Sequence, residues 1–416
     1  MRTDELDYLL PPDLIAREPA RPRDHSRLMV YRRATDRTEH RRFYELPELL
    51  EPGDLLIAND TRVLPAKLIL RKASGGLITG LFLSEAAPRR WRILLRSRGR
   101  VSSGMVLAAI ARPQPAPVAQ TVELVLCERL SEKGQWIAQL NTDQPAPQVL
   151  AQIGCIPLPP YIEKARAADW PGRGGTATVP HPDDGLPLPP FGVSEVRQPA
   201  EPAITRGRPA VRREAAPTLA RPLIAERPTD ATDYQTIYAQ AVGALAAPTA
   251  GLHFTPQLLE QLRLRRLEPA FLTLHVGLGT FLPVSTARLE DHPMHGEWFT
   301  VRSVLVEQLR RQRAAGRRIV AVGTTTVRAL ETAADTILNP AVSVQDITAI
   351  SELFIQPGFH FQLTDALITN FHLPRSTLLA LVAALVGLPR LKALYQQAVR
   401  SGYRFYSFGD AMLILP

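Results

Sequence analysis

Two segments combine glycine, histidine and threonine in a pattern that suits proton transfer beside a bound ligand. In the segment PTAGLHFT, at 248–255, Thr249 and Gly251 come shortly before His253. In the second segment, LHVGLGTF, His275 is followed by residues of the same kinds, which are Gly277, Gly279 and Thr280. An imidazole exchanges protons near neutral pH, and glycine lets a ligand approach the backbone closely. A lone loop histidine is more often structural, but the repetition predicts one pocket with His253 and His275 as a proton-transfer pair.

The segment DHPMHGEW, at 291–298, supplies an alternative proton acceptor. It contains Glu297, which we expect either to transfer a proton or to bind ribose hydroxyls. Its histidine and glutamate spacing is not an established zinc motif, and Pro293 and Gly296 oppose a helix. We therefore expect no metal at this place.

The segment DALITNFHLPRSTLL, at 365–379, ends an apolar run in a polar turn. Asn370 and His372 follow the apolar residues, and an apolar helix that begins near Ser376 would hold the turn rigidly. We take His372 as a further candidate base and Asn370 as a candidate ligand contact.

The segment RRIVAVGTTTVRALE, at 317–331, predicts a strand, a glycine turn and the start of a helix. Its three adjacent threonines are Thr324, Thr325 and Thr326, and Arg328 follows them. Backbone amides and hydroxyls at a helix N-terminus favour an anion, although ordinary helix capping is the simpler function of any single threonine. The cluster favours a ligand carboxylate or phosphate, and the absence of a P-loop lysine disfavours a nucleoside triphosphate.

Aromatic residues alternate with polar ones in YRFYSFGDAMLI near the end of the chain. They are Tyr403, Phe405, Tyr406 and Phe408. Such rings stack on nucleic acid bases in some proteins, although core packing is the more common use of any one of them.

Positive charge is concentrated in one stretch of the chain. The sequence has 49 Lys and Arg against 40 Asp and Glu, a net charge of +9. Residues 61–100 contain ten Lys or Arg and one acid, Glu85, so their excess, 10 − 1 = +9, equals that of the whole chain. A solvated charged face is the alternative, but the concentration favours a surface that binds RNA phosphates. The predicted contacts are Arg62, Lys67, Arg96, Arg98 and Arg100.

These segments need a scaffold, and the pattern of apolar runs predicts two kinds. Short β-rich runs such as KLIL, WRILLR and QWIAQL indicate a small antiparallel β-barrel at 67–150. Apolar strands such as RRIVAVG, SELFI and DALIT, each followed by a loop, indicate a large α/β domain. Ligands bind at the carboxyl ends of strands in open α/β sheets, where the candidate residues fall. The α/β domain should comprise 1–66, 151–164 and 233–416.

Residues 165–232 differ in composition from the rest of the chain. They are rich in Pro, Arg, Ala and Gly and show no sustained periodicity. We expect a disordered insertion here.

Nothing in the sequence is typical of export or of a membrane span. The N-terminus carries acids early, and the longest apolar run, 378–388, is shorter than the roughly 20 residues that cross a bilayer. Cys127 and Cys155 do not lie in a paired-ligand spacing. We expect a cytosolic, monomeric α/β protein without a membrane partner, disulfide or metal.

Ten blocks of sequence, spread over nearly the whole chain, resemble the corresponding blocks of the S-adenosylmethionine:tRNA ribosyltransferase-isomerase family of the queuosine pathway and occur in the same order. They are DYLLPPDLIAREPARPRDHSRLMV, FYELPELLEPGDLLIANDTRVLPAKL, IPLPPYI, DYQTIYAQAVGALAAPTAGLHFT, LHVGLGTFLPV, MHGEW, AVGTTTVRALE, ELFIQPGF, LITNFHLPRSTLL and YRFYSFGDAMLI. Composite matches of this length are far more specific than a short glycine motif.

The resemblance implies a large α/β domain interrupted by a small β-barrel, and a reaction that consumes S-adenosylmethionine as a co-substrate. The ribosyl part would be transferred to a 7-aminomethyl-7-deazaguanine base at the tRNA wobble position and isomerised to an epoxycyclopentanediol, releasing adenine and methionine. The elbow from Thr324 to Arg328 would then bind the methionine carboxylate. Two departures from the family pattern are the long insertion and Gly80, where many relatives carry an acid.

Other functions stay open on the residues alone. An RNA methyltransferase would use the same co-substrate, but the chain lacks a glycine-rich fingerprint with a following acid. A noncatalytic RNA-binding protein would explain the basic stretch but not the Gly/His/Thr loops. A serine hydrolase is disfavoured because no G-x-S-x-G elbow occurs.

Overall fold

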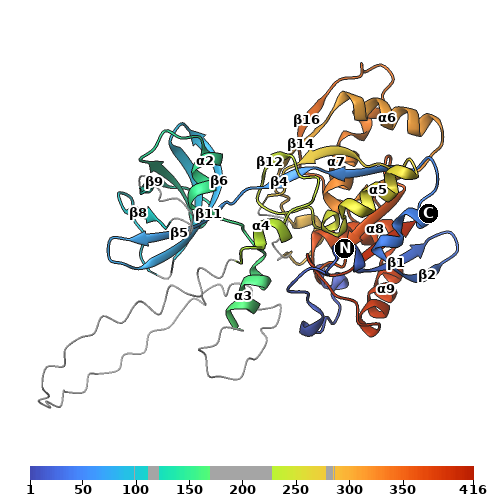
Figure 1. Cartoon of the computed structure of the whole chain (residues 1–416), viewed down its shortest axis with the longest axis horizontal. Coiled ribbons are helices and arrows are strands. Elements are labelled where there is room, and N and C mark those ends of the chain that lie inside the picture. Colours follow the sequence, from blue (N-terminus) through green and yellow to red (C-terminus); the bar gives the residue numbers. More distant parts are fainter. Residues whose placement is uncertain (98, 111–120, 169–226, 278–283, 285) are drawn as a thin grey trace, which may run out of the picture.

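The protein contains a large α/β unit and a smaller β-barrel beside it (Figure 1). The structure, a computed structural model, describes residues 1–97, 99–110, 121–168, 227–277, 284 and 286–416. The barrel is inserted into the α/β unit, and the chain enters and leaves it at the side that faces that unit (Figure 1). The predicted fold class is confirmed.

The α/β unit is built on a mixed nine-stranded sheet. Its strands are β1 (Arg27–Arg32), β2 (Arg37–Arg42), β3 (Leu55–Asn59), β13 (Ala270–Leu274), β14 (Glu297–Val301), β15 (Ile319–Val322), β16 (Ile347–Ser351), β17 (Ala366–Asn370) and β18 (Ala411–Leu415). They lie in the order β16-β14-β13-β3-β15-β17-β18-β1-β2. The central strands β13, β3, β15 and β17 are parallel, so their carboxyl ends meet at one edge of the sheet. Strand β18 is antiparallel to β17 and parallel to β1, so both β18 and β1 begin at that edge.

A small ribbon pairs β4 (Thr61–Val63) with β12 (Ala241–Ala244). The segment SELFI was predicted as a strand, but β16 ends at Ser351, the first residue of that segment. Residues 348–350 are exposed and less apolar than SELFI. They form the edge strand instead because their backbone pairs with β14.

Alternating side chains bury both faces of the central strands. In β15, Ile319 and Ala321 belong to one hydrophobic core, whereas Val320 and Val322 belong to the other. Burial on both faces explains why such strands are continuous apolar runs. The first face is covered by α6 (Ser303–Ala314), α7 (Thr324–Leu338), α8 (Thr377–Val386) and α9 (Leu388–Arg400), and the second by α1 (Leu46–Leu49) and α5 (Pro256–Leu264). Short 3-10 helices are η1 (Thr3–Leu6), η2 (Pro12–Leu14), η3 (Arg23–His25), η4 (Phe43–Glu45), η6 (Thr249–His253) and η8 (Leu289–Asp291).

Six antiparallel strands close the smaller unit into a barrel. They are β5 (Lys67–Lys72), β6 (Leu77–Ala87), β7 (Arg90–Arg96), β10 (Gln135–Leu140), β9 (Glu123–Arg129) and β8 (Val106–Ala109), and β8 pairs back with β5. Helix α2 (Ala146–Ile153) packs its apolar face on the barrel core, and β11 (Gly154–Cys155) then pairs with β5. A Cβ atom at Gly80 would lie 3.2 Å from Leu95 and 3.3 Å from Leu70. A side chain at this position would therefore press on two leucine side chains of the barrel core.

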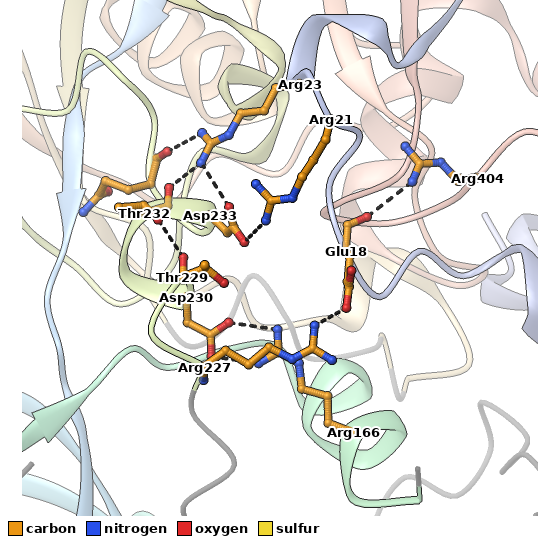
Figure 2. Close-up of polar contacts among 11 residues, drawn as sticks. Glu18, Arg21, Arg23, Arg166, Arg227, Thr229, Asp230, Thr232, Asp233 and Arg404 are labelled. Atoms are coloured by element: carbon orange, nitrogen blue, oxygen red, sulfur yellow. Dashed lines mark hydrogen bonds and ion pairs between the residues drawn. The ribbon is translucent and has the colours of Figure 1, made fainter. Parts of the chain in front are cut away.

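The two ends of the expected insertion are ordered, which corrects part of the prediction for 165–232. Helix α3 (Pro160–Ala168) and helix α4 (Asp230–Asp233) occupy these ends, while 169–226 lie outside the described residues. The guanidinium of Arg166 donates hydrogen bonds of 2.7 and 2.8 Å to the carboxylate of Asp230 (Figure 2). The Asp230 side chain is fully buried. Composition did not reveal this order because the two residues that create it are 64 positions apart.

Further ion pairs join this place to the N-terminal segment of the chain. Arg227 pairs with Glu18, and Arg21 pairs with Asp233 at 2.6 Å (Figure 2). Arg404, which precedes β18, donates to the carbonyl of Glu18 at 3.3 Å. These contacts hold α3 and α4 against the α/β unit.

The described residues include no single helix with the length and apolar character that a membrane span requires. Helices α8 and α9 satisfy that test only as a pair, by length and composition alone, and a bend of 111° separates them.

Candidate active site

The predicted chemistry-bearing segments lie where the central strands end. Strand β13 leads into His275, β15 leads into Gly323 and Thr324, and β17 ends with Asn370, two residues before His372. All three strands are parallel members of one sheet, so their last residues lie at the same edge. This is the edge at which open α/β sheets bind ligands.

A pocket, here called the main pocket, opens at this edge. Its empty space, including its mouth, is about 950 Å³. The predicted site residues that line it are Thr249, Thr324, Thr325, Asn370 and His372. Its wall also includes Pro159, Pro160, Tyr161, Phe371, Leu373, Tyr406 and Ser407. Among the described residues that line the main pocket, none carries a formal charge at neutral pH.

Helix α7 begins at the main pocket. Gly323 precedes it with a φ of +89°, a conformation that glycine adopts without strain, and no side chain caps the helix. The N–H groups of Thr324, Thr325 and Thr326 have no hydrogen-bond acceptor among the described residues. The Thr326 hydroxyl donates to the carbonyl of Val322 at 2.6 Å and its side chain is fully buried, so it does not line the pocket. The N-terminal amides of the helix thus offer a site for an anion.

His253 lies behind the pocket wall rather than in it. Its Nε2 atom is 3.2 Å from Nδ2 of Asn370, and its Nδ1 atom is 2.7 Å from Oγ of Ser26. The hydroxyl of Thr249 donates to Oδ1 of Asn370 at 2.7 Å, which assigns the NH₂ group of Asn370 to His253. The Nε2 atom is therefore the acceptor, and Nδ1 carries the proton. Burial lowers the pKa of His253 to about 3, so the ring is neutral. Both ring nitrogens are hydrogen-bonded to other side chains of the protein.

His372 lines the main pocket and differs from His253 in one respect. Its Nε2 atom is 2.7 Å from the hydroxyl of Thr369, but Nδ1 has no hydrogen-bond partner in the described part of the chain. Its backbone is held on both sides, because its N–H donates to the Tyr395 hydroxyl at 3.0 Å and its carbonyl accepts from Tyr8. Burial lowers the pKa of His372 to about 3. In the tautomer in which Nε2–H donates to Thr369, Nδ1 offers a lone pair.

His275 has different neighbours. Its Nδ1 atom is 2.8 Å from the hydroxyl of Thr61, and its ring stacks on Trp298 with a centroid distance of 4.9 Å. Burial lowers the pKa of His275, and the charge of Asp60 opposes that shift. His275 does not line the main pocket, so the structure does not bring His253 and His275 together as the repeated sequence pattern predicted.

Glu297 and Arg328 form a buried ion pair that lines a second, smaller cavity of about 460 Å³, and Leu378 lines both this cavity and the main pocket. The Oε1 atom of Glu297 accepts the N–H of Gly277 at 2.8 Å, and Oε2 accepts from Arg328. Arg328 also donates to two backbone carbonyls at 3.1 and 3.0 Å. Direct binding of a ligand carboxylate by Arg328 would therefore require the ion pair to open. We call this cavity the side pocket; it is lined by His292, Met294, His295, Glu297, Arg328, Leu353, Phe354, Ile355, Thr377, Leu378 and Leu381.

The remaining predicted ligand contacts are of two kinds. The backbone of Gly251 packs against the hydroxyl of Tyr238, so Gly251 serves close packing and does not line the main pocket. Gly279 and Thr280 lie outside the described residues.

The chain matches the model of a family described as queuosine biosynthesis protein over residues 3–173 and 209–414. The chain belongs to the queuosine biosynthesis protein family. Curated relatives named S-adenosylmethionine:tRNA ribosyltransferase-isomerase are similar over the full length. The relative from Gloeobacter violaceus is 40% identical over 419 residues, which cover 100% of this chain and 96% of that relative. The relative from Thermotoga maritima is 40% identical over 420 residues, which cover 100% of both chains.

A solved structure of S-adenosylmethionine tRNA ribosyltransferase from Thermotoga maritima is 33% identical, with coverage of 99% of this chain, 100% of that chain and a TM-score of 0.47. Membership of the queuosine biosynthesis protein family makes the chain an enzyme of tRNA modification. The family match leaves residues 174–208 unmatched, within the stretch that the sequence analysis set apart as an insertion.

In this queuosine biosynthesis protein, the predicted tRNA contacts lie on the barrel and on the nearby strand β4. Those that are exposed to solvent are Arg62, Arg96 and Arg100. Lys67 pairs with Glu163 of α3, so its charge is already partly neutralised. Arg98 lies outside the described residues.

The histidines of the DHPMHGEW segment, His292 and His295, line the side pocket together with Glu297. In the part of the chain that the structure describes, no group of three or more His, Cys, Asp or Glu side chains is placed to hold a metal ion. His292 packs its ring against Phe354, and His295 is exposed.

One wall of the main pocket consists of residues that the sequence did not predict for the site. Tyr161 and Ser407 were not singled out, and Tyr406 was one of several aromatic residues for which core packing was the more common interpretation. The structure buries the neighbouring rings of Tyr403 and Phe405 in the core but places Tyr406 in the pocket wall. A signal was present in the break of the period-two pattern at Tyr406, which directly follows Phe405 and precedes the polar Ser407.

Proposed function

We propose that this enzyme transfers the ribosyl part of S-adenosylmethionine to the aminomethyl group of a 7-deazaguanine base at the wobble position of a tRNA. The sugar is isomerised to an epoxycyclopentanediol, and adenine and methionine are released. One observation supports this function above others: the main pocket combines a neutral imidazole nitrogen with unpartnered helix N-terminal amides at the carboxyl edge of the sheet.

The imidazole of His372 is our candidate for the base that starts the reaction. The sulfonium group of S-adenosylmethionine acidifies its 5′ carbon, because the electron pair left by proton removal is stabilised by the adjacent positive charge. Nδ1 of His372 accepts this proton, since it lacks a partner in the described residues and its residue lines the pocket. Adenine then leaves with the electron pair of its glycosidic bond, the tRNA amine attacks in its neutral form, and methionine departs as a neutral thioether.

The other three predicted catalytic residues are not proposed to take the proton in this step. His253 uses both ring nitrogens in protein contacts, so we propose that it positions Asn370 and does not itself transfer a proton. Glu297 is held by Arg328 and the amide of Gly277, and it shapes the side pocket. His275 lies outside both pockets, beside the ribbon formed by β4 and β12.

Binding of the co-substrate follows from the polar residues of the main pocket. The amides of Thr324 and Thr325 are proposed to bind the methionine carboxylate, because an anion is stabilised at a helix N-terminus. Thr249 and Asn370, which are hydrogen-bonded to each other at 2.7 Å, are proposed to bind the ribose hydroxyls. The exposed arginines of the barrel are proposed to bind tRNA phosphates.

The proposed function is tested by incubating the protein with S-adenosylmethionine and a tRNA that carries the aminomethyl-deazaguanine base. Released adenine and the mass of the modified nucleoside are measured together. Adenine release with the mass gain of an epoxycyclopentanediol supports the proposal. A methyl mass gain with formation of S-adenosylhomocysteine would instead show methyl transfer, and tRNA binding without turnover would show a noncatalytic protein.

A further inference from the structure

Two tyrosines from distant parts of the chain form a corner in the wall of the main pocket. Tyr161, in the first turn of α3, and Tyr406, just before β18, contact each other with ring centroids 4.5 Å apart and ring planes inclined by 50°. Both residues line the pocket. The Tyr161 hydroxyl accepts the N–H of Ser407 at 3.1 Å, which fixes the corner to the turn that carries Tyr406.

The backbone of Tyr406 is held in a conformation that side chains disfavour. Its φ is +72°, in the left-handed region that bulky residues rarely adopt. The conformation is imposed by the neighbouring backbone, because the N–H of Tyr406 donates to Phe371 at 3.0 Å and its carbonyl accepts from Gly409 at 2.9 Å. A residue kept in a strained conformation in a pocket wall usually contributes to function, since glycine or asparagine would otherwise occupy the position at lower cost.

The ligand of this pocket carries a positive charge that the described wall does not neutralise. S-Adenosylmethionine has a sulfonium cation next to its reacting carbon, yet no Asp or Glu lines the main pocket among the described residues. Aromatic faces attract cations through the negative charge above the ring, most strongly where water is excluded. Burial raises the pKa of both tyrosines well above the usual value, so both rings are neutral phenols at physiological pH.

We propose that Tyr406, supported by Tyr161, binds the sulfonium group of S-adenosylmethionine through cation–π contacts. This inference rests on the proposed function. Two rings inclined to each other converge on a point, as a compact cation requires, whereas a flat adenine ring needs a parallel face. The corner therefore discriminates the charged co-substrate from its neutral thioether analogues.

The test compares S-adenosylmethionine with S-adenosylhomocysteine, which lacks the positive charge. In steady-state assays of adenine release at saturating modified tRNA, we would measure KM for S-adenosylmethionine and the inhibition constant of S-adenosylhomocysteine. Tyr406→Asn removes the ring but tolerates the left-handed backbone, and Tyr406→Phe keeps the ring and removes only the hydroxyl. Tyr44→Asn, at an exposed tyrosine outside the pocket, is the matched control.

We expect Tyr406→Asn to reduce the preference for the sulfonium ligand over the thioether about tenfold, and Tyr406→Phe and Tyr44→Asn to leave it nearly unchanged. An equal loss of affinity for both ligands in Tyr406→Asn would show stacking on adenine or simple loss of shape and would overturn the inference. If Tyr406→Asn does not fold, Tyr161→Leu carries the same comparison. Absence of adenine release by the wild-type enzyme would refute the proposed function itself, independently of Tyr406.

Discussion

The amide nitrogen of Asn370 lies 3.2 Å from Nε2 of the buried His253. This contact fixes the orientation of the Asn370 side chain, whose oxygen accepts the Thr249 hydroxyl in the pocket wall. The sequence predicts that His253 transfers protons, but on this geometry we expect it to orient the amide of Asn370 and to affect catalysis only indirectly.

His253→Ala should reduce kcat/KM about 10- to 100-fold, because the Asn370 amide would lose its fixed position. His253→Gln should recover most of this loss, since a glutamine oxygen accepts from Asn370 but does not transfer a proton. Adenine release under single-turnover conditions measures both variants. Equal inactivity of the Ala and Gln variants, with both folded, would show that His253 transfers a proton after all.

His372→Gln should behave in the opposite way. Glutamine preserves a hydrogen bond to Thr369 but offers no basic nitrogen to the pocket, so kcat should fall by about 10²- to 10⁴-fold. Binding of S-adenosylmethionine should change little, because the neighbouring amides and hydroxyls stay in place. A variant that retains more than a tenth of the wild-type kcat would exclude His372 as the base.

The two buried histidines also predict how stability depends on pH. The pKa of each ring is lowered by burial to about 3 from the value of 6.5 in an unfolded chain. Below pH 6.5 the unfolded state therefore binds more protons than the folded state, and the free energy of unfolding falls as the pH is lowered toward 3. The slope is about 1.4 kcal/mol per pH unit for each histidine.

Denaturant unfolding between pH 4.5 and 7 measures this slope. We expect His253→Gln to reduce it by the contribution of one histidine. The same slope in the wild-type protein and the variant would mean that the ring of His253 is protonated in the folded state.

Arg328→Met should destabilise the fold strongly. It removes the guanidinium that pairs with the buried carboxylate of Glu297, and breaking one side of a buried ion pair costs about 3–5 kcal/mol. Adding Glu297→Gln to Arg328→Met should recover much of this loss, which thermal unfolding would measure. A large rise in KM for S-adenosylmethionine in the folded double variant would support direct contact of Arg328 with the ligand carboxylate.

Replacing Arg96 and Arg100 together by Gln should weaken tRNA binding and flatten its salt dependence. Each phosphate contact contributes about one unit to the slope of log K against log salt concentration, so the double variant should lose up to about two units. Filter binding at several salt concentrations measures this slope, with Arg400→Gln on α9 as the matched control. An unchanged slope would remove this face of the barrel from the tRNA interface.

The sequence predicted the scaffold and the edge of the sheet at which the site lies. Apolar runs that end in Gly, Thr, Asn or His indicate strands with polar residues at their carboxyl ends, at one edge of the sheet. Thr324, Asn370 and His372 do line one pocket there. This prediction succeeded because the alternation of strands and helices along the chain implies parallel strands. That alternation can be recognised in short stretches of sequence.

The roles of individual side chains could not be predicted in this way. His253 and His275 both follow a leucine in segments that contain glycine and threonine, yet Ser26 and Asn370 contact one ring while Thr61 contacts the other. The hydrogen-bond partners of these rings come from strands and loops far away in the chain. The periodicity of a single sequence therefore does not predict them. The same limit applies to Tyr161, whose part in the pocket depends on contact with residues some 245 positions later.

The ion pair between Arg166 and Asp230 has a consequence for the evolution of the chain length. It joins α3 to α4, so these two helices stay together whatever the number of residues between them. Each doubling of a flexible loop costs only about 0.6 kcal/mol of closure entropy. Selection on stability therefore exerts little pressure on the number of residues between these two helices, which makes this junction a tolerant place for a peptide tag or a fused reporter domain.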